Sequence, residues 1–213
     1  WSHFARADEP GHDFNREQRE KFIQAVAEAK AVGVNPDVIH LSNSAATIND
    51  SDSHFDLVRL GISMYGLSPD VKTMGNSIEL NLKPALKLRA KIHLVKDVPA
   101  GSQVGYGGTY ITKVDTKLGV ISMGYADGVP RRLSAVGGEV LIGGHRCPIV
   151  GVVTMDQLMV DVGDQTVAVG DEVVLIGAQG TESVSANEWG SRLGTIGYEI
   201  VCGLSNRLPR HYR

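Results

Sequence analysis

The chain has 213 residues, of which 42% are hydrophobic and 21% are charged, an ordinary composition for a globular protein with a buried core. A formal net charge of -3 excludes the basic surface typical of nucleic-acid-binding proteins and gives no polybasic signal for a membrane surface. No apolar run approaches the ~20 residues of a membrane span. The two cysteines, Cys147 and Cys202, are too few for a disulfide framework, so we expect a cytoplasmic protein.

The first stretch, residues 1–5, reads Trp-Ser-His-Phe-Ala and has the pattern of the end of a buried strand. Because the chain opens inside such a pattern and without methionine, we interpret it as part of a longer protein. A helix is expected next. Asn15 and Gln18 have the spacing of a capping box, apolar residues then recur at helical spacing, and Gly33 occupies the position of a C-terminal cap.

Two short apolar runs, residues 38–41 and 57–60, predict two more strands. Polar residues follow the first run, and Ala45-Ala46-Thr47 can start a short helix between the two runs. Strand, helix, strand, short helix and strand in this order is the pattern of parallel β/α units. We therefore assign residues 1–80 to an α/β domain.

From about residue 81 the pattern changes to that of antiparallel strands. Apolar and charged residues alternate through residues 86–94 with the period of two typical of a half-buried strand. Gly143-Gly144 is a hairpin turn signal, and Ser185 with Glu188 forms a second capping box that opens a late helix. Residues 81–213 are therefore predicted to form a mainly antiparallel β domain. Its other predicted strands are 119–123, 139–142, 147–150, 158–162 and 172–176.

Two polar pairs follow the predicted parallel strands, at the position where α/β folds bind their ligands. Asn43-Ser44 follows residues 38–41, and Gly61-Ile62 follows residues 57–60. A serine hydroxyl, a glycine amide and a helix N-terminus can together hold a phosphate without a lysine. An equally supported alternative is that Asn43-Ser44 merely caps the following helix.

Two further polar residues lie inside apolar strands. Arg59 lies two residues before Gly61, and a buried arginine is costly unless it is paired. It is therefore a candidate for the same site, although an arginine on the outside of a barrel strand fits equally well. His3 lies in the first strand, where a histidine that is hydrogen-bonded within the core is the commoner outcome.

Residues 104–110, Val-Gly-Tyr-Gly-Gly-Thr-Tyr, form the most unusual stretch. Gly105, Gly107 and Gly108 surround Tyr106, and glycines permit turns and close backbone approach that other residues resist. Such a loop can project the Tyr106 phenol out of its own domain into a neighbouring cleft. The alternative is a hairpin loop with one semi-buried tyrosine, because glycine clusters mark turns more often than sites.

Several motifs together resemble those of the alanine racemases. They are HFA at residues 3–5, HLSNSAA at 40–46, VRLGISMYGLSP at 58–69, VGYGGTY at 104–110, GYADGVPR at 124–131, VGVVTMDQLMVDV at 150–162 and GYEIVCGLSNRLPRHY at 197–212. Members of that family are pyridoxal 5'-phosphate enzymes with a (β/α)8 TIM-type barrel followed by a β domain. The resemblance implies interconversion of L-alanine and D-alanine, which supplies D-alanine for cell-wall peptidoglycan.

The resemblance covers nearly the whole chain and corresponds to the C-terminal part of such an enzyme. It implies that residues 1–80 are the last part of the (β/α)8 barrel, with the phosphate loops. Residues 81–213 would then be the β domain that carries the catalytic tyrosine.

By resemblance, the cofactor site draws on residues of both domains. Arg59 would face the pyridine nitrogen of the cofactor, and His3 would lie beside the cofactor and hydrogen-bond towards the catalytic tyrosine. An arginine is always charged and would keep that nitrogen unprotonated, which restrains side reactions. The residues that the resemblance assigns to the phosphate are Ser44, Gly61, Ile62 and Tyr198.

The resemblance makes Tyr106 one of two catalytic bases, because racemisation removes the α proton on one face and returns a proton on the other. In the family this tyrosine comes from the partner subunit of a homodimer, and the other base is the lysine that binds the cofactor. A free phenol has a pKa near ~10, and the surroundings of Arg59 and His3 are expected to lower it. Tyr125 and the backbone of Met155 would lie at the substrate entrance and the substrate carboxylate.

The sequence departs from the family in one respect. The cofactor lysine of these enzymes lies in a motif of the type KADAYGHG, and no lysine of this chain lies in such a motif. We therefore expect the isolated chain to be inactive and the parent protein to be the racemase. Two alternatives remain open, namely a non-catalytic module that dimerises or binds partners, and a racemase of serine or of broader specificity. No metal site is expected, and Asp127 and Asp156 are expected to be structural.

Overall fold

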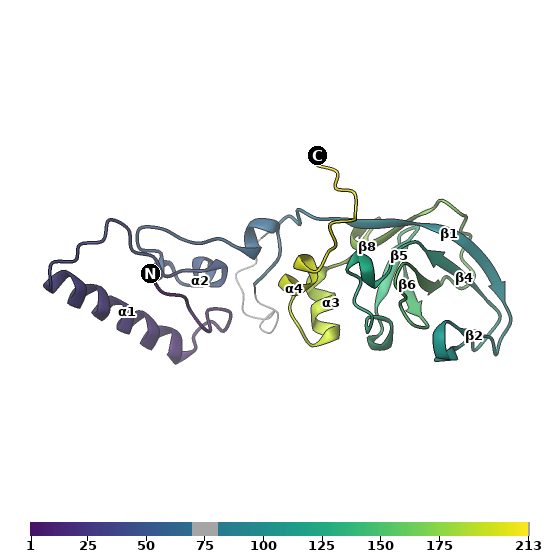
Figure 1. The fold of residues 1–213 in the computed structure, drawn as a ribbon, viewed down its shortest axis with the longest axis horizontal. Helices are drawn as coiled ribbons and strands as arrows, with labels where there is room; N and C mark the ends of the chain where they lie inside the picture. The colour runs from purple at the N-terminus through teal and green to yellow at the C-terminus, as the bar shows by residue number, and fades with distance from the viewer. Residues whose placement is uncertain (70–80, 213) are drawn as a thin grey trace. The chain divides into compact units, whose positions relative to one another are not determined.

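The computed structural model describes residues 1–69 and 81–212 (Figure 1). The chain divides into two compact units, Trp1–Ala85 and Leu86–Arg213. The first unit contains helices and extended segments, and the second consists mainly of β-strands. Over the two described ranges, no helix is both long enough and apolar enough to cross a membrane.

The described part of the first unit contains two α-helices, α1 (Asp13–Ala31) and α2 (Ser44–Asn49). The sequence predicts Asn15 as the cap of α1, and this prediction is wrong. The His12 side chain accepts the capping hydrogen bond instead, so the helix begins at Asp13. The Asn15 side-chain amide instead donates to two backbone carbonyls of the preceding loop. The predicted end of the helix is confirmed, since Gly33 has the positive φ, 88°, that commonly follows a helix C-terminus.

The three apolar runs of the first unit are extended, but none of them is a strand in the described structure. Two backbone hydrogen bonds, from Asp56 to Ile39 (3.2 Å) and from Arg59 to Ser42 (3.0 Å), advance in the same direction along both runs, so these runs are parallel. The ladder is interrupted because the Ile39 amide binds the Asp56 carboxylate and the Arg59 side chain binds the Leu41 carbonyl. The parallel strands of a (β/α)8 barrel therefore remain a prediction.

One hydrophobic cluster forms the core of the first unit. Phe22 of α1 contributes to it and lies edge-on to Phe55, with ring centroids 5.4 Å apart and ring planes at 69°. Two short 3-10 turns, η1 (Ser51–Ser53) and η2 (Ile62–Tyr65), follow α2 and the third extended run. The buried residues of the cluster are Phe4, Ala7, Phe22, Leu41, Ala45 and Ala46.

The second unit is built on a closed barrel of antiparallel strands (Figure 1). The strand order is β1-β4-β7-β6-β5-β8, and β8 pairs with β1 so that the barrel closes. Strand β9 (Glu182–Val184) forms a hairpin with β8. The predicted mainly antiparallel arrangement is therefore confirmed for this unit. The barrel strands are β1 (Leu88–Val98), β4 (Thr116–Ile121), β5 (Glu139–Ile142), β6 (His145–Val150), β7 (Leu158–Asp161) and β8 (Glu172–Gln179).

Closure of the barrel depends on the length of β1. Its first residues, 88–91, pair with β8, and its later residues, 92–98, pair with β4. Strand β5 in turn pairs with both β6 and β8. The predicted hairpin turn between β5 and β6 is confirmed, because Gly143 and Gly144 have φ of 57° and 83°, the two positive values that a tight turn of this kind needs.

A small hairpin and two helices are attached to the barrel. Strands β2 (Gln103–Val104) and β3 (Tyr110–Ile111) flank the turn η3 (Tyr106–Gly108). Helix α3 (Ala186–Leu193) starts as predicted, with the Ser185 side chain as its cap. Helix α4 (Gly197–Cys202) is absent from the sequence prediction because no side-chain cap marks its start. Two more 3-10 turns are η4 (Tyr125–Asp127) and η5 (Ser134–Val136).

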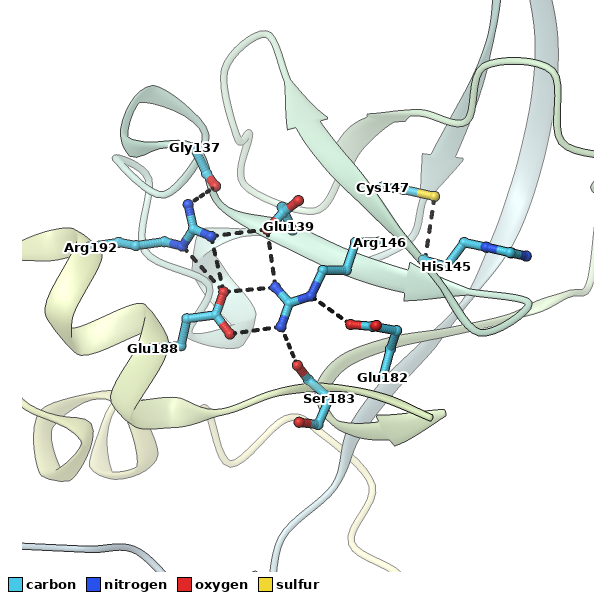
Figure 2. A network of polar contacts seen from close by, with 9 residues as sticks. All are labelled: Gly137, Glu139, His145, Arg146, Cys147, Glu182, Ser183, Glu188 and Arg192. Carbon is cyan, nitrogen blue, oxygen red and sulfur yellow. Dashed lines mark hydrogen bonds and ion pairs between the residues drawn. The ribbon is translucent and has the colours of Figure 1, made fainter. Parts of the chain in front are cut away.

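A network of arginine and glutamate side chains ties α3 to the barrel (Figure 2). Arg146 on β6 binds Glu139 on β5 (3.1 Å) and Glu182 on β9 (3.0 Å). It also binds Glu188 on α3 (2.9 Å). Arg192 of α3 binds Glu188 (3.1 Å) and Glu139 (2.9 Å). Because these side chains are only partly exposed, the network fixes one face of α3 against β5, β6 and β9.

Candidate functional site

The Ser44 hydroxyl is the centre of the first candidate site. Asn43 caps α2, since its side-chain oxygen accepts a hydrogen bond from the Ala46 amide (3.0 Å), so the capping alternative is correct for Asn43. The Ser44 hydroxyl has a different partner set. Its oxygen accepts hydrogen bonds from the amides of Gly61 (2.8 Å) and Ser63 (3.4 Å). Backbone donors around the start of η2 therefore converge on one buried hydroxyl.

This arrangement fits a phosphate group. Ser44 is 4% exposed, and the buried Ser63 hydroxyl has no hydrogen-bond partner among the described residues. A β-carbon on Gly61 would lie 3.6 Å from the Ser44 hydroxyl oxygen, an ordinary van der Waals contact, so the backbone at Gly61 passes close to this hydroxyl. Ile62, the first residue of η2, is buried. Hydroxyls and backbone amides of this kind are the donors that hold phosphates in proteins.

Arg59 is held by acceptors from the two other extended runs. Its Nη2 donates to the carbonyls of Ser2 (2.8 Å) and Leu41 (3.1 Å). The same nitrogen lies 3.1 Å from Nδ1 of His3, and Nη1 contacts Nδ1 of His40. The half-buried guanidinium thus has the partners that burial of a charge requires, and it fixes the spacing of the three runs.

His40 is a member of this cluster that the sequence analysis does not single out. Burial and the positive charge of Arg59 lower the pKa of His40, so its imidazole stays neutral and can accept a hydrogen bond from Arg59. The only signal in the sequence is a histidine within the apolar run 38–41. His3 is exposed rather than buried in a core, and its Nε2 lies 3.3 Å from the Asn43 side-chain amide.

The first unit therefore brings its predicted site residues together into one polar cluster. Arg59 contacts His3, His3 contacts Asn43, and the next residue, Ser44, binds Gly61. Tyr198, the fourth residue predicted to bind phosphate, belongs to the second unit, where it is the second residue of α4 and is half-buried.

Tyr106 projects outward from the second unit. The residue is 74% exposed, so it is not semi-buried, although the loop that carries it is a hairpin. Gly105 and Gly107 have φ of 72° and 73°, values that residues with a β-carbon rarely adopt. Gly108 also has a positive φ, 57°. The glycines are therefore required by the path of the backbone that exposes the phenol.

The hairpin that carries Tyr106 is fixed to the barrel at two points. Val104 is 4% exposed and packs in a small hydrophobic cluster with Leu118 of β4. The Tyr110 hydroxyl donates to the Asp161 carboxylate at the end of β7 (3.0 Å). Burial and the hydrogen bond to Asp161 raise the pKa of Tyr110, so this phenol stays protonated and remains a donor. The base of the hairpin is thus rigidly attached, while its tip is exposed.

Tyr106, Tyr125 and Met155 line one cavity of the second unit, with a volume of about 440 Å³. Arg131 and residues 152–157 complete its lining. Tyr125 is 41% exposed and Met155 is 54% exposed, so both side chains are accessible from solvent. The structure therefore brings together the predicted base and both predicted substrate residues, which lie in three separate loops of the chain.

Two family models match the chain, one in each unit. The model described as "Alanine racemase, N-terminal domain" matches residues 1–69. The model described as "Alanine racemase, C-terminal domain" matches residues 85–212. The two matches together include the polar cluster of the first unit, which contains Ser44 and Arg59, and the cavity of the second unit lined by Tyr106.

Curated relatives with the name alanine racemase match along the whole chain. The relative from Symbiobacterium thermophilum is 48% identical over 213 residues, which is 100% of this chain and 55% of the relative. The relative from Frankia casuarinae is 47% identical over 212 residues, with the same coverage of both proteins. The chain thus spans about half the length of the curated relatives that it matches.

Solved structures of alanine racemases match with the same coverage. The enzyme from a Streptomyces lavendulae strain that produces D-cycloserine has a TM-score of 0.93 and 44% identity, covering 100% of this chain and 55% of that one. The enzyme from Bacillus anthracis, solved with bound L-Ala-P, has a TM-score of 0.92 and 43% identity, covering 99% of this chain and 54% of that one.

Proposed function

The chain belongs to the alanine racemase family, and on that premise we propose that its parent protein interconverts L-alanine and D-alanine with pyridoxal 5'-phosphate. One observation carries the proposal: an exposed phenol, Tyr106, lines the same cavity as Tyr125 and Met155. Racemisation needs a base in reach of the α carbon and groups that hold the substrate. The proposed role is the supply of D-alanine for peptidoglycan, in the cytoplasm.

Binding of the cofactor phosphate is proposed for Ser44, Gly61 and Ile62, together with Tyr198. The Ser44 hydroxyl and the nearby Ser63 hydroxyl, which has no partner among the described residues, support this assignment, since hydroxyls are among the donors that hold a phosphate. When bound, the cofactor withdraws electrons from the α carbon of the amino acid attached to it, which acidifies the α proton.

Arg59 is proposed to face the pyridine nitrogen of the cofactor. Its guanidinium is always charged, so it disfavours a proton on a neighbouring nitrogen. Two backbone carbonyls and two imidazoles hold Arg59, so its position is fixed before any ligand binds. His3, which contacts Arg59, is proposed to lie beside the cofactor and to hydrogen-bond towards the catalytic tyrosine.

Tyr106 is proposed to be the base on one face of the substrate, supplied to the active site of the partner subunit in a homodimer. Its outward projection on a rigidly attached hairpin supports a role outside its own unit. A phenolate is needed for proton abstraction, and a phenol at its ordinary pKa of ~10 would supply little of it at neutral pH. The positive charge of Arg59 and the hydrogen bond from His3 are proposed to favour the phenolate form of Tyr106.

The second base is proposed to be a lysine in the part of the parent protein that matches the KADAYGHG type of motif. No lysine of this chain lies in such a motif, so we propose that residues 1–213 alone do not racemise alanine. In this proposal the chain contributes Arg59, Tyr106 and the residues that bind the cofactor phosphate. The lysine attaches the cofactor and serves as the base on the substrate face opposite Tyr106.

A racemisation assay on the full-length protein tests the proposed function. With pyridoxal 5'-phosphate, L-alanine should yield D-alanine at a rate well above that with L-serine, and residues 1–213 alone should yield none. A full-length protein that binds the cofactor but racemises neither amino acid would instead support the non-catalytic module. Faster turnover of serine would support the racemase of serine or of broader specificity.

A further inference from the structure

The Arg207 guanidinium joins two loops of the second unit. Its Nε donates to Oδ1 of Asp127 over 2.7 Å, and its Nη2 donates to Oδ1 of Asp156 over 2.7 Å. Asp127 ends the turn η4, which begins with Tyr125, and Asp156 directly follows Met155. One side chain thus holds both of the loops that contribute Tyr125 and Met155 to the cavity.

The two loops are also in direct backbone contact. The Tyr125 amide donates to the Thr154 carbonyl (2.9 Å), and the Ala126 amide donates to the Met155 carbonyl (3.0 Å). A β-carbon on Gly124 would lie 2.3 Å from the Thr154 carbonyl oxygen, so the backbones are packed too closely for a side chain. An outward movement of either loop would therefore stretch both hydrogen bonds.

The segment that carries Arg207 is fixed to the same turn. The Ser205 amide donates to the Asp127 carbonyl (3.1 Å). A β-carbon on Gly128 would lie 2.4 Å from the Gly203 carbonyl oxygen, so the two backbones are in van der Waals contact there. Arg207 therefore reaches both aspartates from an anchored backbone rather than from a free tail.

Arg207 and its two aspartate partners form a clamp with two arms, one to Asp127 and one to Asp156. The two ion pairs differ in strength. Asp127 is 7% exposed, and its second oxygen accepts a hydrogen bond from the Gly124 amide (2.8 Å). Burial opposes its ionisation, but the hydrogen bonds from Arg207 and Gly124 outweigh burial and lower the pKa of Asp127. The Asp156 side chain is 61% exposed, and exposed ion pairs contribute little. The arm to Asp127 is therefore the stronger one.

We propose that Arg207 is a positioning residue that sets the separation of Tyr125 and Met155, and with it the width of the substrate end of the cavity. A lysine would not replace it, because the two bonds leave from different nitrogens of a planar fork, whereas an ammonium is a single point donor. The clamp follows from the contacts alone. Its effect on catalysis rests on the proposed racemase function.

Amide hydrogen exchange of the full-length protein, resolved at Tyr125 and Ala126, tests the clamp. Exchange at both amides should be at least ~10-fold faster in Arg207→Gln, the scale expected when a charge-assisted hydrogen bond to a buried group is lost. Arg207→Lys should restore little of this protection. Arg210→Gln, an exposed arginine of the same segment, is the matched control and should leave exchange unchanged. Wild-type exchange at both amides in Arg207→Gln would overturn the proposal.

Steady-state kinetics with the same variants test the effect on the substrate. Arg207→Gln should raise the KM for alanine by ~10-fold, on the same energetic scale. It should leave the affinity for pyridoxal 5'-phosphate unchanged, because the residues proposed for the phosphate are others. If amide exchange becomes faster in Arg207→Gln but its KM for alanine equals that of wild type, Arg207 has no role in positioning the substrate. Absence of racemase activity in the wild-type protein would defeat the proposed function, and the exchange data would still decide the clamp.

A second variant covers the case in which Arg207→Gln fails to fold. Asp156→Ala removes only the exposed arm, so it should fold normally. Its exchange should increase at Ala126, whose amide binds the Met155 carbonyl next to Asp156. Unchanged exchange at Ala126 both in this variant and in Arg207→Lys, which keeps the charge but loses the planar fork, would contradict the clamp.

Discussion

The Arg59 side chain donates to the backbone carbonyls of Ser2 and Leu41, and it contacts the imidazoles of His3 and His40. These contacts add to the backbone hydrogen bonds that join the three extended runs. A group that serves a proposed cofactor site thus also stabilises the first unit, and both roles depend on the shape of the guanidinium as much as on its charge.

Arg59→Lys should therefore destabilise the protein although it preserves the charge. A lysine cannot reach two carbonyls and two imidazoles at once, so we expect a loss of about 1–3 kcal/mol in the free energy of unfolding, as for buried acceptors left unpaired. Urea denaturation of the full-length protein measures the loss. Arg16→Lys, on the exposed face of α1, should change stability little. Equal stability of the two variants would contradict this account of Arg59.

At the scale of elements, the hairpin β2–β3 illustrates how the fold presents a functional residue. Its tip exposes Tyr106, while Tyr110 at its base is bound to Asp161 of β7. Asp161 also accepts a hydrogen bond from Thr116 of β4. One carboxylate therefore joins the hairpin to two strands of the barrel.

Tyr110→Phe should loosen the hairpin without unfolding the barrel. The change removes one hydrogen bond to a charged group and leaves the ring, so we expect a loss of about 1.5–3 kcal/mol in local stability. Hydrogen exchange should become faster for residues 103–111, while β5 and β6 keep their protection. Equal acceleration in the barrel strands would show that Tyr110 supports the whole unit instead.

The network in Figure 2 predicts a dependence of stability on pH. Burial opposes ionisation of Glu188, but its hydrogen bonds to Arg146 and Arg192 lower its pKa overall. A carboxyl whose pKa is lower in the folded state stabilises the fold above its unfolded pKa, ~4.3, and this stabilisation is lost as the pH falls through the folded value.

Glu188→Gln should therefore lower the melting temperature at pH 7, and the difference from wild type should shrink as the pH falls below ~4. Thermal unfolding of both proteins between pH 7 and pH 3 measures this. Glu17→Gln, an exposed glutamate of α1, is the control and should have no such effect. A difference that stays constant with pH would mean that packing of the side chain, rather than its charge, stabilises α3.

Much of the second unit could be predicted from the sequence because local patterns determine it. The strand at 139–142, the Gly143-Gly144 turn and the Ser185 cap are all present in the structure. Closure of the barrel could not be predicted, because the pairing of β1 with β8 joins residues far apart in the chain. The cap at Asn15 was predicted wrongly, since the loop before the helix uses its side chain.

At the scale of the whole molecule, the predicted site residues fall into two groups, one in each unit. The sequence grouped Ser44 with Gly61 correctly, because both follow strand-like runs whose ends meet. It did not single out His40, although a histidine within the apolar run 38–41 is a local signal, and it did not indicate Arg207, which nothing local distinguishes. The contact of Arg207 with Asp127, for example, spans 80 positions and exists only in the folded unit.

The proposed homodimer predicts complementation between two inactive subunits. One variant carries Tyr106→Phe, and the other lacks the lysine that binds the cofactor. If the tyrosine acts in the partner's site, a mixed dimer contains one site with both bases, so mixing should restore part of the racemase activity. Mixtures that stay inactive, although subunits exchange, would indicate that both bases come from one chain.

The central claim, that Tyr106 is one of two bases, is tested most directly by α-proton exchange in D2O with the full-length enzyme and its Tyr106→Phe variant. Racemisation should fall by ~10²–10⁴-fold in both directions, the usual contribution of a general base. Exchange of the α proton should persist for the enantiomer that the lysine deprotonates and be lost for the other. Tyr212→Phe, which alters another exposed tyrosine, should resemble wild type. Exchange of both enantiomers at wild-type rates in Tyr106→Phe would contradict the claim.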